Sequence, residues 1–353
     1  MNPGLSRRRF ISVIAAAAGY CVASRASAAE DQIARSELLK WQGRALGAET
    51  SILISAQPTP AIQKLIRHCV DEIRRLELIF SLYQNDSILM GLNRLANVDH
   101  PPSELVDILI ESRRFNELTN GSFDPTVQPL WDLYATHFSD PRPDPMGPAA
   151  TEIVRRVRLV DFRNVVITPQ RIAFAQPGMA ITLNGIAQGY ITDRVVKILR
   201  DAGMSDVLVD IGETAALGEH PEGRPWRVGL ANPQDFARPF LDTELRNEAV
   251  ATSGGYGMRF DANGRFHHLF DPRTGRSGER YLSVTVVAPR ATAADALSTS
   301  FSLMAEADIS ATLSRIDSTR AIIMTLDGSV LLINSHRSKR IKAMVANFTC
   351  GDC

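Results

Sequence analysis

The stretch that most constrains how this chain folds is residues 180–214, in which two apolar runs flank a segment of helical spacing. Ala180 to Leu183 predicts a short buried strand, and Asp206 to Ile211 predicts a second one. The chain turns through Asn184-Gly185 between the first strand and the helix. The helix is indicated by four apolar residues that fall on one face: Ile191, Val195, Ile198 and Leu199.

A glycine-bearing turn between a strand and the start of a helix is a place where an anion can bind. Backbone N–H groups and the positive end of the helix dipole both point toward such a turn. The spacing Gly185-x-x-x-Gly189 matches neither the dinucleotide-binding fingerprint nor the Walker loop. On this segment alone, a phosphate cradle and an ordinary scaffold turn are equally good interpretations.

The rest of the chain indicates an α+β fold with mixed, largely antiparallel sheets and flanking helices. Strands outnumber helices, and several are joined as hairpins. The clearest hairpin places Asp327-Gly328 between two runs of strand character, 320–326 and 329–333. Further strands are predicted within 41–55 and over 226–231, 249–252 and 281–288, and helices over 61–80, 103–118, 292–304 and 308–316.

Several connecting segments have weaker patterns. We expect residues 81–93 to form a polar connection, and Ser103 to cap the helix that follows. The four prolines between Ser139 and Ala150 indicate a surface loop rather than a domain boundary. Alternation over 157–167 and 171–175 predicts a pair of strands.

Residues 1–28 have the pattern of an export signal. Three arginines, Arg7 to Arg9, precede a modest apolar run, and Ala26-Ser27-Ala28 is a small-x-small cleavage site. Paired arginines are typical of the Tat route, so we expect a periplasmic protein. The residue before Cys21 is Tyr20, which is too large for a lipoprotein signal, so we do not expect a lipoprotein.

Charge and hydropathy exclude two classes of partner. The chain has 39 basic and 39 acidic residues. Cleavage of the signal removes four arginines and no acidic residue, which leaves a mildly acidic protein. Nucleic-acid binding is therefore not expected, because it normally requires a basic surface. No later stretch has the roughly 18 consecutive apolar residues of a membrane span.

Three cysteines remain after cleavage. Cys69 lies on the apolar face of a predicted helix and is expected in the core. Cys350 and Cys353 form a C-x-x-C tail over 350–353, for which a local disulfide is favoured over a metal site because no second ligand pair exists. The domain between signal and tail is expected to span 29–349.

Asp295 and Thr299 are the first candidates for chemistry. They lie four residues apart on a predicted helix and so share one face. A carboxylate and a hydroxyl are hard oxygen ligands suited to Mg²⁺. The alternative is a capping box, Thr292-x-x-Asp295, in which Asp295 only satisfies the start of its own helix. Spacing alone favours the cap.

His267 and His268 are the second candidates. Adjacent residues on a strand point to opposite faces, so only one of the two is expected to face a site. A single histidine is more often structural. One that lies near a carboxylate and a metal can act as a general base.

Five segments, in order along the chain, together resemble the ApbE family, the FAD:protein FMN transferases. The resemblance covers roughly Leu38 to Val345. The segments are Ser122-Phe123-Asp124-Pro125-Thr126-Val127, Leu183-Asn184-Gly185-Ile186-Ala187-Gln188-Gly189-Tyr190, Ala251-Thr252-Ser253-Gly254, His268-Leu269-Phe270-Asp271-Pro272-Arg273-Thr274-Gly275 and Ala294-Asp295-Ala296-Leu297-Ser298-Thr299. The second segment and the Tat-type signal resemble the NosX branch, which is associated with nitrous-oxide respiration.

The resemblance implies a function and a set of site residues. The family moves FMN from FAD to a threonine or serine hydroxyl of an acceptor protein and releases AMP, with Mg²⁺ on the pyrophosphate. The acceptor is expected to be a membrane-bound flavoprotein that faces the periplasm. The metal ligands would be Asp295, Thr299 and the carbonyl of Gly185, and the catalytic residues His268 and Asp295. The residues that would line the FAD site are Tyr83, Ser122, Phe123, Asp124, Thr182, Gln188 and Leu269.

The sequence departs from the family pattern at several of these positions. Thr182 stands where an acidic residue is usual, and Gln188 stands where Lys or Glu is common. Leu46 replaces a methionine, and Gly212-Glu213-Thr214 replaces Gly-Gly-Asp. Because of these departures two alternatives stay open. One is hydrolysis of FAD to FMN and AMP, and the other is an accessory protein that binds FAD without turnover.

Overall fold

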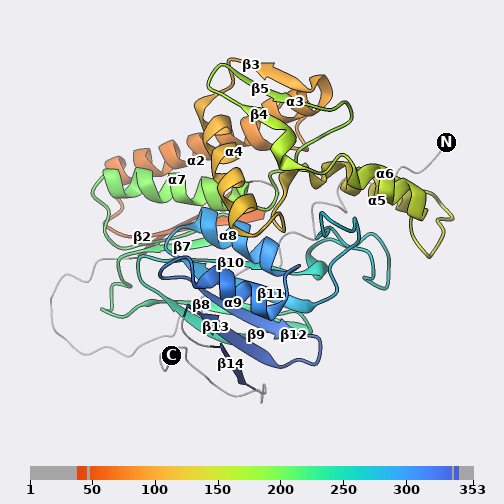
Figure 1. Cartoon of the computed structure of the whole chain (residues 1–353). Coiled ribbons are helices and arrows are strands. Elements are labelled where there is room, and N and C mark those ends of the chain that lie inside the picture. Colours follow the sequence, from red (N-terminus) through yellow and green to blue (C-terminus); the bar gives the residue numbers. More distant parts are fainter. Residues whose placement is uncertain (1–37, 46–47, 336–337, 342–353) are drawn as a thin grey trace.

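The computed structural model describes residues 38–45, 48–335 and 338–341 (Figure 1). The predicted export signal, Leu46 and the Cys350–Cys353 tail lie outside these residues and remain predictions. No helix in the described ranges is long and apolar enough to cross a membrane. Cys69 is fully buried, as expected.

A nine-stranded sheet forms the centre of the molecule. Every strand pairing in this sheet is antiparallel, which agrees with the largely antiparallel α+β fold expected from the sequence. Asp327-Gly328 joins β12 (Arg320–Thr325) to β13 (Val330–Asn334) in a hairpin, as predicted. Across the sheet the strands are β1 (Leu38–Ala45), β2 (Ala48–Ser55), β6 (Val207–Asp210), β7 (Thr214–Leu217), β10 (Ala249–Ser253), β11 (Tyr281–Ala288), β12 (Arg320–Thr325), β13 (Val330–Asn334) and β14 (Ser338–Ile341).

Both faces of this sheet are covered, because successive apolar residues of its strands point to opposite sides. In β6, Val207 and Val209 join the core beneath the helices, whereas Leu208 joins a second core with Trp226. The second core lies under the hairpin of β8 (Trp226–Asn232) and β9 (Asp235–Leu245). The predictions for 226–231 are confirmed, but β9 was not anticipated.

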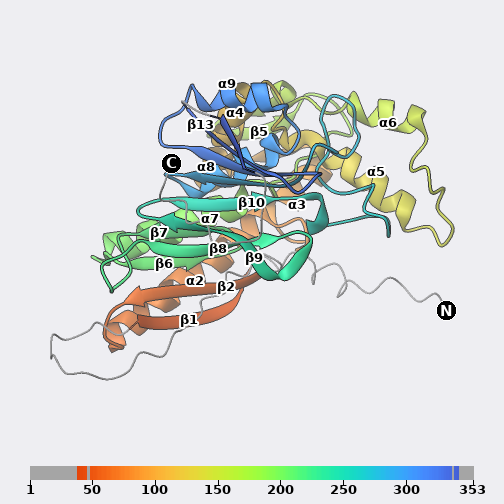
Figure 2. The ribbon, with the colours of Figure 1, turned by 90° about the horizontal axis from the view of Figure 1, so that it is seen from below.

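Helices cover the other face (Figures 1 and 2). The helix α7 (Ala187–Asp201) packs on α8 (Ala291–Phe301) and on α2 (Pro60–Phe80), and α8 packs on β10 and β11. The helix α9 (Glu306–Leu313) packs on β13. The helical spacing of Ile191 to Leu199 is therefore confirmed, and the helix predicted over 292–304 is confirmed as α8, which ends at Phe301. The two helices lie side by side.

The remaining elements form a lobe beside these helices (Figure 1). They are α3 (Ile88–Leu95), α4 (Ser103–Leu118), η1 (Pro125–Val127), α5 (Gln128–Phe138), α6 (Ala150–Val157), η2 (Phe162–Asn164) and the small sheet of β3 (Asn97–Asp99), β5 (Arg171–Phe174) and β4 (Val165–Ile167). A one-turn 3₁₀ helix η3 (Gly255–Gly257) follows β10.

Three predictions in this lobe are wrong in part. The expected polar connection 81–93 contains α3, which begins because the Ser87 hydroxyl accepts the Met90 N–H at 3.1 Å. Residues 157–164 end a helix and form η2, so only Val165–Ile167 pairs with β5. Ser103 is the first residue of α4 and makes no capping bond.

The predicted strand Ala180–Leu183 is also wrong, although Ile181 and Leu183 are fully buried. The side chain of Asn93 donates to the Ile181 carbonyl at 2.8 Å and accepts its N–H at 2.8 Å. The N–H of Thr182 donates to the Pro125 carbonyl at 2.8 Å. Since these bonds replace a sheet ladder, the segment belongs to no sheet.

Candidate functional site

The contact between α7 and α8 is the frame of the candidate site. The Gly189 N–H, in the first turn of α7, donates to the Asp295 carboxylate of α8 at 3.0 Å. The helices approach so closely that a Cβ on Gly189 would lie 2.3 Å from the Ala291 carbonyl oxygen. Only glycine fits here, and it brings the turn after Asn184 against the face of α8 that carries Asp295 and Thr299.

The capping-box alternative for Asp295 is wrong. The helix α8 begins at Ala291, and its cap residue Arg290 makes no side-chain capping bond. The N–H groups of Ala291 and Thr292 donate instead to Asp193 of α7, at 2.8 and 3.0 Å. Because Asp193 already accepts the first N–H groups of α8, Asp295 does not cap its own helix. It accepts the Gly189 N–H of α7.

Asp295 is buried without a cation beside it. Its exposed fraction is 3%, and among the described residues it forms no ion pair. Burial, together with the charge of Asp193, raises the pKa of its carboxyl to about 7. A buried carboxylate in this state favours either a proton or a metal ion.

Glu213 is a second buried carboxyl at this end of α7, with an exposed fraction of 8%. Burial and the charges of Asp295 and Asp210 raise its pKa well above the ordinary value, while the Thr252 N–H lowers it. The sequence showed Glu213 only as a departure from the family pattern. Its burial beside Asp295 adds to the negative charge that a cation here would offset.

Thr299 and Gly185 complete a set of oxygen donors. A Cβ on Gly185 would lie 2.9 Å from the Thr299 hydroxyl, so the turn and α8 leave room only for glycine. The Ser253 hydroxyl lies 3.4 Å from that of Thr299 and 2.8 Å from that of Ser298. Ser253 was not named as a site residue from the sequence, although it lies in the segment Ala251-Thr252-Ser253-Gly254 that resembles the ApbE family.

These residues fit a hard divalent cation. A carboxylate, a hydroxyl and a backbone carbonyl are the oxygen ligands that Mg²⁺ takes when its remaining positions hold water and substrate phosphates. Within the described part of the chain, no group of three or more His, Cys, Asp or Glu side chains is arranged to hold a metal. A site on Asp295, Thr299 and the Gly185 carbonyl needs only one carboxylate.

The two adjacent histidines differ in their hydrogen bonds. Both ring nitrogens of His267 are engaged, Nε2 with the Gly278 carbonyl at 2.7 Å and Nδ1 with the Leu269 N–H at 3.3 Å. Among the described residues, the ring of His268 forms one hydrogen bond, from Nδ1 to the Met258 carbonyl at 3.2 Å. That bond makes Nδ1 the protonated nitrogen and leaves the lone pair of Nε2 available.

Burial also keeps His268 neutral. It lowers the pKa of this imidazole to about 4, and the neighbouring His267 acts in the same direction. No hydrogen bond joins His268 to Asp295 or Thr299 among the described residues. The link between them is the chain itself, because Ser253 beside Thr299 leads through η3 to Met258.

Several of the residues expected to line a flavin site are linked to the 180–186 segment by hydrogen bonds. The Tyr83 hydroxyl accepts from the Asn184 side chain at 3.4 Å, and Tyr83 is 59% exposed. Ser122 and Phe123 are buried, and Asp124 caps η1 by accepting the Thr126 N–H at 2.8 Å. The Thr182 hydroxyl accepts the Asn184 N–H at 3.2 Å.

Gln188 and Leu269 are placed apart from this group. The Gln188 side-chain amide packs against the backbone of Gly212, in the turn after β6. Leu269 is buried next to His268. The structure thus joins Tyr83, Asp124 and Thr182 through the loop at Pro125 and Asn184, and it joins Gly185, Asp295 and Thr299 through the α7–α8 contact.

Comparison with known proteins identifies relatives along most of the chain. The ApbE family matches residues 46–323. A FAD:protein FMN transferase of Vibrio cholerae is 30% identical over 279 residues, which are 76% of this chain and 82% of that protein. One from Treponema pallidum is 30% identical over 272 residues, 69% and 72% of the two chains.

Solved structures agree. The ApbE protein of Thermotoga maritima superposes with a TM-score of 0.73 at 27% identity, over 83% of this chain and 96% of that one. The flavin transferase ApbE of Vibrio cholerae gives a TM-score of 0.71 at 25% identity, over 88% and 98%. With a family match that spans most of its length and an antiparallel α+β fold shared with these structures, the chain belongs to the ApbE family.

Proposed function

We propose that this protein is a Mg²⁺-dependent FAD:protein FMN transferase that attaches FMN through a phosphoester to a threonine or serine hydroxyl and releases AMP. The observation that carries the proposal is the buried Asp295 carboxylate, which has no cation among the described residues and lies against the glycine turn at the start of α7. The relatives named above carry the same activity in their names.

Asp295, Thr299 and the Gly185 carbonyl would hold the metal. When bound, Mg²⁺ would neutralise the pyrophosphate of FAD and make its phosphorus more open to attack. The turn at Gly185 also lies at the start of α7, where the helix dipole favours a phosphate.

His268 is proposed as the general base. Its Nε2 would take the proton of the acceptor hydroxyl while that oxygen forms a bond to the phosphorus of the FMN half. The bond between this phosphorus and the bridging oxygen breaks, and AMP leaves with the electron pair. The Nδ1–H bond to Met258 holds the ring in the tautomer that this step needs.

The flavin half is proposed to lie on Tyr83, whose exposed ring offers a stacking surface next to Asn184. The turn at Ser122–Asp124, with Thr182, Gln188 and Leu269, would form the rest of the FAD site. Thr182 and Gln188 are neutral where relatives commonly carry charge, so binding at these positions would rest on hydrogen bonds.

We propose that the reaction takes place in the periplasm, and the predicted Tat-type signal over residues 1–28 supports this location. The acceptor is proposed to be a membrane-bound flavoprotein that faces the same compartment, in keeping with a NosX-like role in nitrous-oxide respiration. Co-expression of the chain with such a neighbouring flavoprotein, followed by intact-mass measurement, tests this assignment.

The decisive experiment incubates the mature protein with FAD, Mg²⁺ and an acceptor domain and measures the mass of the acceptor. Transfer adds the mass of FMN less one water to the acceptor and yields one AMP for each acceptor modified. Loss of the added mass on chelation of Mg²⁺ is expected as well. An unmodified acceptor under all conditions argues against the proposal.

The same experiment separates the two alternatives. A FAD pyrophosphatase produces free FMN and AMP without an acceptor. An accessory protein binds FAD tightly, and no AMP appears under any condition.

A further inference from the structure

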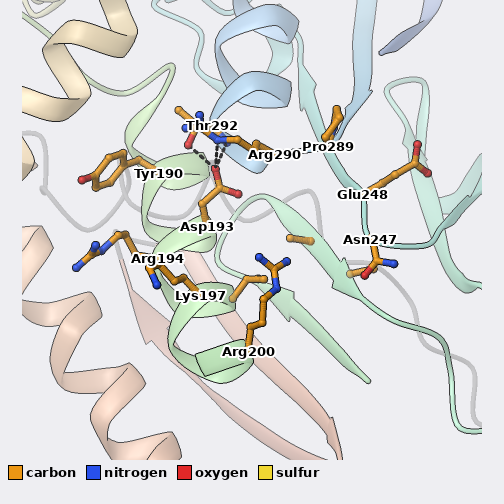
Figure 3. A pocket seen from close by; sticks show the side chains of 13 residues that line it. Tyr190, Asp193, Arg194, Lys197, Arg200, Asn247, Glu248, Pro289, Arg290 and Thr292 are labelled. Carbon is orange, nitrogen blue, oxygen red and sulfur yellow. Dashed lines mark hydrogen bonds and ion pairs between the residues drawn. The ribbon is translucent and has the colours of Figure 1, made fainter. Parts of the chain in front are cut away.

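A pocket of about 280 Å³ lies on the outer side of the α7–α8 contact, away from the residues assigned to FAD and Mg²⁺ (Figure 3). Its walls come from α7 between Tyr190 and Arg200, from β7, from the turn before β10, and from the start of α8 with the turn before it. The polar side chains on its walls include four cations, Arg194, Lys197, Arg200 and Arg290.

The acidic side chains of the pocket are already engaged. Asp193 accepts from the N–H groups of Ala291 and Thr292 and from the Thr292 hydroxyl, so it serves the start of α8. Glu248 forms an ion pair with Arg320 at 2.6 Å, outside the pocket. Among the described residues, Glu248 pairs with no cation on these walls, and Asp193 pairs there only with Arg290, at 3.5 Å.

The cations differ in how firmly they are held. Arg194 pairs with Glu72 at 3.2 Å, and Lys197 pairs with Asp201 at 2.6 Å. Arg290 has only long contacts, 3.4 Å to Glu111 and 3.5 Å to Asp193.

Arg200 has no side-chain hydrogen bond or ion pair with any described residue, although it lines the pocket. In Figure 3 its side chain rises from the last turn of α7 into the space between Lys197 and Asn247. A guanidinium group presents five N–H donors in a planar fork that suits a phosphate or carboxylate. This arginine therefore offers an unused anion contact inside a concave site.

The floor of the pocket is apolar. Ala215 and Ala216 of β7 and Val196 of α7 are buried beneath the cations. Close packing of Gly189 on Ala291 separates this floor from Gly185 and Thr299. A ligand here would not be in contact with the residues proposed for flavin transfer.

We propose that this pocket binds a small doubly charged oxyanion, either inorganic phosphate or the phosphate end of a phosphomonoester, with Arg200 as the main contact and Arg290 and Lys197 at its sides. Asn247 supplies an amide at the rim. The small volume favours a compact anion over an extended acidic peptide. This site is separate from the proposed transfer reaction and does not depend on it.

Calorimetric titration of the full chain, saturated with FAD and at constant ionic strength, tests the proposal. Inorganic phosphate and adenosine monophosphate are titrated in separate arms. We expect saturable binding of one anion per chain, weakened at least about tenfold in Arg200→Met. Arg200→Glu should abolish it. Arg114→Met, at an exposed arginine of α4 without a side-chain partner among the described residues, is the matched control and should bind like the parent.

The outcomes separate the sources and the rival explanations. Equal affinity in the two arms identifies free phosphate as the ligand class, and tighter binding of the nucleotide identifies a phosphomonoester. Absence of saturable binding overturns the proposal. It is also overturned if saturating FAD removes the binding, if Arg200→Met leaves it unchanged, or if Arg114→Met weakens it equally.

Discussion

At each end of the contact between α7 and α8, an aspartate of one helix accepts backbone N–H groups of the other, but the two aspartates differ in burial and in their charged neighbours. At the inner end, Asp295 of α8 accepts an N–H from α7, and at the outer end, Asp193 of α7 accepts two N–H groups from α8. Asp193 is 24% exposed and has Arg290 3.5 Å away. Asp295 is almost fully buried and has no cation among the described residues.

This difference shows that hydrogen bonding to a helix start does not by itself make an aspartate a ligand. Asp193 joins two helices, and its charge is offset by solvent and by an arginine. Asp295 makes a similar bond, but burial leaves its charge without compensation. The inner end of the contact, at Asp295, therefore favours binding of a metal cation. The outer end carries arginine and lysine side chains, which favour binding of an anion.

The largest expected effect comes from Asp295→Asn. The amide oxygen still accepts the Gly189 N–H, but the negative charge for the metal is lost. FMN transfer should fall roughly 10³-fold, which corresponds to about 4 kcal/mol of transition-state stabilisation. Acceptor mass and Mg²⁺ binding by calorimetry measure the effect. Asp193→Asn is the matched control and should retain transfer within about threefold of the parent; equal losses in the two variants would break the comparison.

A second test compares the two histidines. His268→Gln should lower the rate of transfer roughly 10²- to 10⁴-fold, the usual range for a general base, with FAD and Mg²⁺ binding retained. His267→Gln should instead lower the free energy of unfolding by about 1–3 kcal/mol, because two buried hydrogen bonds are lost. Single-turnover kinetics and urea unfolding check the two effects. A His268 variant of full activity would remove it from the proposed mechanism.

The pH dependence of Mg²⁺ binding gives a smaller effect. The pKa of Asp295 is about 7 without metal, so below that pH a proton competes with the cation. The apparent dissociation constant of Mg²⁺ should therefore be about tenfold higher at pH 6 than at pH 8. His268, with a pKa of about 4, does not titrate in this range. Calorimetry at both pH values is the measurement, and Asp295→Asn should lack the pH effect.

The smallest effect is on stability at the outer end. Asp193→Ala leaves the first N–H groups of α8 without their acceptor, so the free energy of unfolding should fall by about 1–2 kcal/mol. Urea unfolding measures this loss. A change in the free energy of unfolding below about 0.3 kcal/mol would mean that the hydrogen bonds from α8 to Asp193 do not stabilise the start of α8.

Much of the fold was predictable from local pattern. The periods of 3.6 and 2 located α2, α7, α8 and most strands of the large sheet, and Asp327-Gly328 located a hairpin. The motifs of the ApbE family also pointed to the candidate residues before any contact was known. Such patterns depend on residues near one another in the chain, so they can be read without the fold.

Only the tertiary structure determined which hydrogen-bond partner each polar group has. Ile181 joins no sheet because the side chain of Asn93, 88 positions earlier, forms hydrogen bonds with both its N–H and its carbonyl group. Asp295 accepts the N–H of Gly189, 106 positions earlier, and does not cap its own helix. The sequence did not show which of His267 and His268 has a ring nitrogen without a hydrogen bond to a described residue. The physical reason is that burial and distant hydrogen-bond partners set the charge and tautomer of a polar side chain. Burial and distant partners both arise from tertiary packing, whereas the apolar periodicity of helices and strands depends only on residues close together in the chain.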